Sequence, residues 1–142
     1  FDAEGNPSVV LMRQYRPAFD RTMIEIPAGM RDVDGEQPEE TARRELIEEA
    51  GLAAGDLDLL VELCPSPGMT DAVTTVYLAT DCTPRDRALQ GPEEDHSELL
   101  HLPLADAIAQ IGSGAITDAK TVAGLLLTEH RLRAGDDGPD GR

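Results

Sequence analysis

The chain has 142 residues, of which 40% are hydrophobic and 28% charged, a composition that suits a single globular domain with one core. No apolar run approaches the roughly 18 residues that a membrane-spanning helix needs, and no charged-then-apolar signal segment opens the chain. The formal net charge of −16 argues against nucleic acid as a partner, because binding to nucleic acid depends on Lys and Arg neutralising phosphates.

The predicted elements combine short strands with three helices. The chain opens on turn formers, Asp2 to Pro7, so we expect a preceding strand or domain to be missing from the N-terminus. Strands are expected at Ser8–Tyr15, Arg21–Ile26, Leu57–Leu63, Ala72–Thr80 and Glu98–Leu102, and helices at Pro38–Ala50, Leu104–Ile111 and about Asp118–Arg131. Strands and helices mixed without strict alternation predict an α/β fold with a mixed sheet flanked by helices.

Local signals define the ends of two helices. Pro38 suits a first helical position, and Gly51 can adopt the left-handed conformation that stops the same helix. Thr117 or Asp118 is expected to cap the last helix. The residues expected to face inward from that helix are Val122, Leu125 and Leu126.

The C-terminal segment and the two cysteines carry no chemistry of their own. Ala134–Arg142 is polar and rich in Gly, so we expect a disordered tail after a domain of residues 1–133. Cys64 and Cys82 show neither a metal-ligand spacing nor a secreted disulfide pattern. We expect both to be buried free thiols, which favours a reducing, cytoplasmic location.

Three carboxylates gather on one face of the predicted helix that begins at Pro38. Glu45, Glu48 and Glu49 fall within an arc of roughly 100°, because each helical residue turns the chain by about 100°. A solvated acidic surface is the plain interpretation of such a cluster. The alternative is a Mg²⁺ site, since Mg²⁺ prefers oxygen ligands and is commonly held by one or two carboxylates together with substrate phosphates.

The segment from Gly29 to Leu52 resembles the Nudix box. That box consists of Gly, Glu, an Arg-Glu-apolar group, a Glu-Glu pair and a Gly-apolar pair at fixed spacing. The residues that match in register are Glu36, Arg44, Glu45, Leu46, Glu48, Glu49, Gly51 and Leu52. Gly29 departs from the pattern, because one extra residue separates it from Glu36. The addition falls in the loop Met30–Gly35, where insertions are tolerated.

The resemblance implies a Nudix-type α/β/α sandwich and a role for each matching residue. Glu45 and Glu49 are expected to bind Mg²⁺, for which Mn²⁺ can substitute, with Glu48 as a further ligand or a neighbouring group. The backbone carbonyl of Ala28 is expected to complete the metal site. Arg44 resembles the arginine that orients the box carboxylates, while Glu36 is expected to fix the loop rather than bind metal. The implied reaction is hydrolysis of a diphosphate linkage.

Residues outside the box resemble the ADP-ribose pyrophosphatase branch of the family. The likeness rests on Arg13-Gln14-Tyr15-Arg16, on Glu25-Ile26-Pro27-Ala28-Gly29, on Ser66-Pro67-Gly68 and on Ile116-Thr117-Asp118-Ala119-Lys120-Thr121. It implies cleavage of ADP-ribose to AMP and ribose 5-phosphate. The substrate-binding residues that it suggests are Arg16, Arg13, Pro67, Gly68 and Met69. Ala72 departs from the branch, in which an acid often follows the Pro-Gly turn.

The catalytic base in this branch usually comes from an acidic loop after the box. Here that loop is Gly91–Glu98, in which Glu94 is the favoured base, Glu93 the next and Glu98 a third candidate. A solvated acidic loop is the plain alternative. His96 could titrate near neutral pH, although a loop histidine commonly has no catalytic role.

Two other functions stay open at this stage. One is a Nudix hydrolase that acts on oxidised nucleoside triphosphates or nucleotide sugars, which would share the box and its metal. The other is a non-catalytic Nudix-like domain that senses ADP-ribose, although such domains commonly lose box carboxylates that this chain retains. The branch resemblance also implies a homodimer that exchanges N-terminal segments.

Overall fold

The computed structural model describes residues 5–87 and 97–136. Every predicted strand and helix is found, with ends that differ by a few residues. The elements in chain order are β1 (Ser8–Arg16), η1 (Pro17–Phe19), β2 (Arg21–Glu25), α1 (Pro38–Ala50), β3 (Leu52–Ala53), β4 (Asp56–Leu63), β5 (Thr74–Thr80), β6 (Thr83–Pro84), β7 (Glu98–Pro103), α2 (Leu104–Gly112) and α3 (Ala119–Asp136). The sequence did not predict η1, β3 and β6, which are too short to show a periodic pattern.

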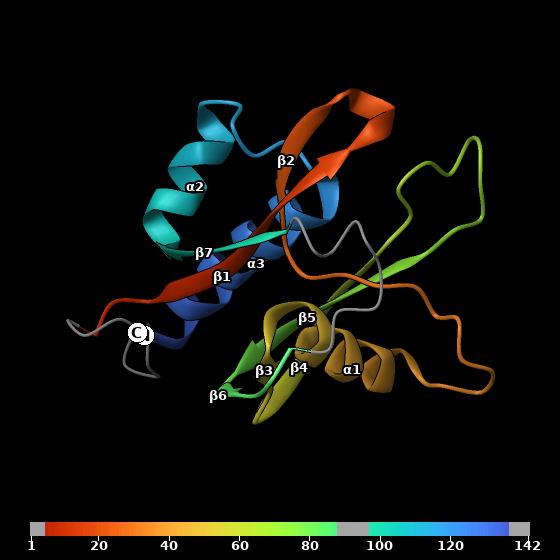
Figure 1. Cartoon of the computed structure of the whole chain (residues 1–142). Coiled ribbons are helices and arrows are strands. Elements are labelled where there is room, and N and C mark those ends of the chain that lie inside the picture. The colour runs from red at the N-terminus through yellow and green to blue at the C-terminus, as the bar shows by residue number, and fades with distance from the viewer. Residues whose placement is uncertain (1–4, 88–96, 137–142) are drawn as a thin grey trace.

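The strands form three antiparallel sheets. β1 lies in the centre of a three-stranded sheet in the order β2-β1-β7, while β4 pairs with β5 and β3 pairs with β6. Figure 1 shows how the helices lie: α2 contacts β1 and β7 of the first sheet, α3 contacts α2 and the β4–β5 pair, and α1 contacts β3 and β5. The expected α/β class is confirmed. A mixed sheet would contain a parallel pair of strands, but all the pairings among the described residues are antiparallel. Residues of β1, β4 and β5 line a common cavity of about 1070 Å³.

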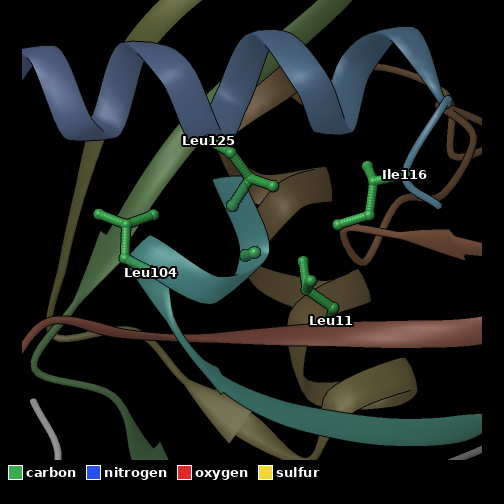
Figure 2. Packing of buried hydrophobic residues seen from close by; sticks show 5 residues of the cluster. Leu11, Leu104, Ile116 and Leu125 are labelled. Carbon is green, nitrogen blue, oxygen red and sulfur yellow. The ribbon is translucent and has the colours of Figure 1, made fainter. Parts of the chain in front are cut away.

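The core lies between β1 and the two C-terminal helices. Its buried apolar residues are Leu11, Leu104, Ala107, Ile116 and Leu125. Figure 2 shows the labelled leucines and Ile116 converging beneath α3. Burying a leucine or isoleucine side chain contributes roughly 1.5–3 kcal/mol, so this cluster fixes α3 against the sheet that contains β1 and β2.

The last helix differs from its prediction in two respects. Asp118 is the cap, and Val122 and Leu125 face inward, but Leu126 is 43% exposed because adjacent helical residues point about 100° apart. The helix also continues to Asp136, past the expected end at Arg131. The first residues of the expected disordered tail are therefore helical, and residues 137–142 lie outside the described part of the chain.

The two cysteines are free, as predicted, but the prediction that both are buried was wrong. Cys64 is exposed, because it follows the last residue of β4, and Cys82 is half-buried. Burial and the charge of Asp81 raise the pKa of the Cys82 thiol. Within residues 5–87 and 97–136, no helix has both the length and the apolar character needed to cross a bilayer.

Candidate active site

The box helix α1 starts and stops where the sequence predicts. Pro38 is its first residue, and the backbone N–H of Gln37 donates to the Glu40 carboxylate over 2.9 Å. Gly51 adopts φ 64° and ψ 36°, the left-handed conformation, and its N–H donates to the Ile47 carbonyl over 2.9 Å. The resulting helix presents its acidic residues on adjacent turns.

Arg44 lies among four carboxylates. Its Nη1 donates to Glu45 Oε1 over 2.7 Å and to Glu48 Oε2 over 2.9 Å. Its Nε donates to Glu36 Oε1 over 3.0 Å, and its Nη2 contacts Asp32 Oδ1 at 3.3 Å. One arginine therefore pairs with four carboxylates, and even with Arg31 nearby the region keeps an excess of negative charge.

Two box acids also contact the strand exit, the segment Glu25–Gly29 that leads from the end of β2 into the box. Glu49 is buried, at 6% exposure, and its Oε2 accepts the backbone N–H of Ala28 over 2.7 Å. The Glu45 carboxylate occupies the space beside Gly29, where an added Cβ would lie 1.8 Å from its Cδ. Only glycine at position 29 leaves room for Glu45 in this position.

The surroundings shift the pKa values of these groups in opposite directions. Burial raises the pKa of Glu45, and the nearby charges of Glu48 and Asp32 raise it further, whereas Arg44 lowers it. A hydrogen bond from Arg44, followed by one from Thr41, lowers the pKa of Glu36. Glu36 thus binds the side chains of Arg44 and Thr41, both of which belong to α1.

The donor set suits a divalent cation, although the carboxylates do not converge. Among the described residues, no three His, Cys, Asp or Glu side chains lie close enough together to hold a metal ion. Glu45 and Glu48 instead bind Arg44, and Glu49 binds Ala28. The oxygen-only chemistry, the excess negative charge and the space that Gly29 leaves for Glu45 all fit a hard divalent cation.

A second charged network lies where β2 meets the first turn of α3. Arg16 binds both carboxylate oxygens of Glu25, through Nε at 2.6 Å and Nη2 at 2.8 Å. Lys120 bridges the carboxylates of Glu25 and Asp118. Burial alone would raise the pKa of Glu25, but the hydrogen bonds from Arg16 and Lys120 outweigh it and lower the pKa to about 2.

This network adjoins the box electrostatically. The hydrogen bond with Glu25 raises the pKa of Arg16, and the negative charges of Asp118 and Glu49 raise it further. Arg16 is therefore close enough to Glu49 to interact with its charge. Its guanidinium, which was expected to contact substrate phosphate, already forms a bidentate pair in this structure, and its side chain is 40% exposed.

The sequence prediction did not assign Glu25, Lys120 or Thr121 to the site. A signal for Glu25 was present, because strand alternation puts it on the same face as Met23, and both residues are buried. An acidic residue on the buried face of a strand needs a cationic partner. The partner itself could not be identified, because Lys120 lies 95 residues further along the chain.

The remaining predicted substrate residues are spread over the surface. Arg13 pairs with Glu98 at 2.8 Å, and both side chains are exposed. Glu98, the third candidate for the catalytic base, is therefore paired with an arginine. Pro67, Gly68 and Met69 form a turn that the Ser66 carbonyl closes, and the Met69 side chain is 90% exposed. The structure does not place this turn among the residues that line the cavity. Glu93, Glu94 and His96 lie outside the described residues.

Comparisons with known proteins determine the family. The NUDIX domain family matches residues 1–125. The chain belongs to the Nudix family. The Nudix chain is 37% identical over 136 residues to an ADP-ribose pyrophosphatase from Mycobacterium tuberculosis, a match that covers 93% of this chain and 63% of that relative. It is 36% identical to a GDP-mannose pyrophosphatase from Cronobacter sakazakii, with 89% of this chain and 68% of that relative covered.

A solved structure supports the same conclusion. The Nudix chain superimposes on a crystal structure of an ADP compounds hydrolase with a TM-score of 0.80 at 27% identity, covering 90% of this chain and 68% of the other. The expected family and fold are thereby confirmed. The chain spans less than two thirds of the length of the ADP-ribose pyrophosphatases that it matches, namely 63% of the M. tuberculosis protein and 60% of one from Bacillus subtilis.

Proposed function

We propose that this Nudix chain forms the catalytic part of a divalent-metal-dependent ADP-ribose pyrophosphatase. The observation that carries the proposal is the acidic cluster that Arg44 organises on α1, directly beside Ala28 and Gly29. The names of the M. tuberculosis relative and of the structural neighbour support a substrate that contains ADP.

In the proposed reaction, the oxygen of a water molecule attacks one phosphorus of the diphosphate. The bond between that phosphorus and the bridging oxygen breaks, and the products are AMP and ribose 5-phosphate, with release of a proton. A bound Mg²⁺ or Mn²⁺ would supply positive charge to the diphosphate oxygens. Glu45 and Glu49, with the carbonyl of Ala28 and with Glu48 as a further ligand, are the groups proposed to hold that ion.

The other residues have supporting roles in this proposal. Arg44 keeps Glu45 and Glu48 at fixed positions, and an exposed part of Arg16 contacts the substrate phosphate. Glu94 is the proposed base that accepts the proton of the attacking water, with Glu93 as the second candidate and Glu98 as the third. Arg13 and the turn Pro67–Met69 are proposed to border the substrate.

A nucleotide sugar is a second candidate substrate, because the C. sakazakii relative is named a GDP-mannose pyrophosphatase. A panel assay separates the candidates. ADP-ribose should give AMP and ribose 5-phosphate, GDP-mannose should give GMP and mannose 1-phosphate, and an oxidised nucleoside triphosphate should give pyrophosphate. We expect ADP-ribose to have the highest kcat/KM in the presence of Mg²⁺ or Mn²⁺.

Glu49→Gln is the decisive control in that assay. Glutamine can still accept the N–H of Ala28, so the substitution removes the negative charge while it preserves the hydrogen bond. Loss of a metal ligand should cost several kcal/mol of transition-state stabilisation, and therefore orders of magnitude in kcat. A Glu49→Gln protein with normal turnover would refute the proposed metal site. If the wild-type protein hydrolysed none of the substrates but still bound ADP-ribose, that result would favour a sensing domain.

The proposal also includes a cytoplasmic homodimer. The two free thiols are compatible with a reducing compartment, and exposed Phe19 and Met69 offer apolar surface for a partner copy. Sedimentation of the purified protein would measure its oligomeric state directly.

A further inference from the structure

The segment from Glu25 to Ala28 joins β2 to the box, and three different elements hold it. The Glu25 carboxylate binds Arg16 of β1 and Lys120 of α3. The backbone N–H of Ala28 binds Glu49 of α1. Between these two points, the N–H of Ile26 donates to the hydroxyl of Thr121 over 2.9 Å. The first turn of α3 therefore contacts the strand exit from which Ala28 reaches the box.

The burial and hydrogen bonding of Thr121 suit it to accept the N–H of Ile26. Its side chain is completely buried, and its single hydroxyl proton is donated to Asp118 Oδ2 over 2.6 Å. The oxygen lone pairs are then available to the N–H of Ile26, which lies beyond the last residue of β2 and so has no strand partner in the ladder. The Ile26 N–H can only donate, so the Thr121 oxygen is the acceptor of that bond while the Thr121 O–H donates to the Asp118 carboxylate.

Asp118 ties the elements of this turn together. Its Oδ2 accepts the backbone N–H of Thr121 over 3.0 Å, which caps α3, and it also accepts from Lys120 over 3.0 Å. Lys120 in turn binds Glu25, the residue before Ile26. One carboxylate thus fixes both side chains through which α3 holds the strand exit.

We propose that the first turn of α3, through Thr121 and Lys120, is a positioning device that sets the location of Ala28 relative to Glu49. Neither residue contacts the reacting atoms; both act through the backbone of Ile26–Ala28. The inference rests on the proposed function, because it concerns the geometry of the proposed metal site. It assigns a role to a motif of α3 that lies 95 residues from the strand exit in the sequence.

The test compares two buried threonines on the same helix. Thr121→Val removes the hydroxyl while it keeps nearly the same shape, and Thr128→Val makes the same change about two turns further along α3. Thr121→Ser restores the hydroxyl. Circular dichroism and the Tm establish that each variant is folded, and electron paramagnetic resonance of free Mn²⁺ measures the affinity of the metal for each protein without substrate.

We expect Thr121→Val to weaken Mn²⁺ binding by about 10-fold or more, as loss of a group that orients a metal ligand commonly does. Thr121→Ser should recover most of that affinity, and Thr128→Val should match the wild-type protein. In turnover assays, Thr121→Val should lower kcat much more than it changes KM. If Thr121→Val does not fold, Lys120→Met serves in its place and should weaken Mn²⁺ binding in the same direction.

The outcomes separate this inference from the proposed function. Equal Mn²⁺ affinities for Thr121→Val and Thr128→Val, or equal losses for Thr121→Val and Thr121→Ser, would overturn the positioning role. An unchanged affinity in Lys120→Met would do the same if that variant is the one used. Normal Mn²⁺ binding by Glu49→Gln would instead overturn the proposed metal site, whatever Thr121→Val does.

Discussion

The two charged clusters of this chain differ in their balance. Around Arg44, one positive charge meets the four carboxylates of Asp32, Glu36, Glu45 and Glu48. At the first turn of α3, Arg16 and Lys120 meet Glu25 and Asp118, so the charges are equal in number. The first cluster keeps an excess of negative charge, which suits a site that binds a cation. In the second cluster the positive and negative charges neutralise one another, which suits a fixed structural support.

Glu25→Gln gives the sharpest test of the balanced cluster. Glu25 is only 4% exposed, and its carboxylate pairs with both Arg16 and Lys120. The substitution removes the negative charge that these two cations share. We expect the free energy of unfolding to fall by about 3 kcal/mol, the lower end for a broken buried pair, because Arg16 is partly solvated. Urea denaturation at pH 7 measures it. A loss below 1 kcal/mol, on the order of an exposed pair, would show that the cluster is not a buried support.

The pH dependence of stability tests the same carboxylate. Folding lowers the pKa of Glu25 from 4.5 to about 2. A lowered pKa stabilises the folded protein above the unfolded value, and this contribution is lost as the pH falls from 4.5 towards 2. Thermal unfolding of the wild-type protein should therefore show a steeper fall in Tm in that window than unfolding of Glu25→Gln. If the Tm of both proteins changed with pH in the same way, Glu25 would not be the group that makes stability depend on pH in this range.

Arg44→Ala tests whether the unbalanced cluster is organised for catalysis. Removal of the arginine releases Glu45 and Glu48 and leaves them to repel each other. We expect kcat for ADP-ribose to fall by about 100-fold, the upper range for loss of a residue that orients metal ligands. Arg43→Ala is the matched control, since Arg43 forms an exposed pair with Glu39 on the same helix. Similar kcat values for the two variants would contradict the assignment.

Gly29→Ala should separate activity from stability. The new methyl group would displace the Glu45 carboxylate, which is the mobile end of a flexible side chain, so the folded state can adapt at low cost. We expect kcat to fall by about 10-fold while the Tm hardly changes. Gly112→Ala, where the added Cβ meets no atom within 4 Å, is the control. A normal kcat for Gly29→Ala would show that Glu45 need not lie beside residue 29.

Arg13→Ala should have the smallest effect on stability. Its pair with Glu98 is exposed on both sides, with side-chain exposures of 47% and 61%, so the free energy of unfolding should change by less than about 1 kcal/mol. The KM for ADP-ribose then decides its function. A clear rise in KM would place Arg13 at the substrate, whereas an unchanged KM would remove it from the proposed site.

Much of the site could be predicted from the sequence because its pattern is local. The spacing of Glu45, Glu48 and Glu49 determines that they share a helix face, and Pro38 and Gly51 define the ends of that helix. The partnership of Arg44 with Glu48 is likewise a contact between adjacent helical turns. The directions in which the carboxylates point were not predictable, since they depend on Arg44, on Gly29 and on the Ala28 N–H together.

By itself, the sequence determined the five longer strands, the three α-helices and the box, because propensity, capping and periodicity act over a few neighbouring residues. Only the tertiary structure decided that Thr121 accepts the N–H of Ile26 and that Lys120 binds Glu25, contacts that span 95 residues. Such contacts exist because the apolar core holds α3 against the sheet, and the energy of that packing is spread over many residues with no local signature.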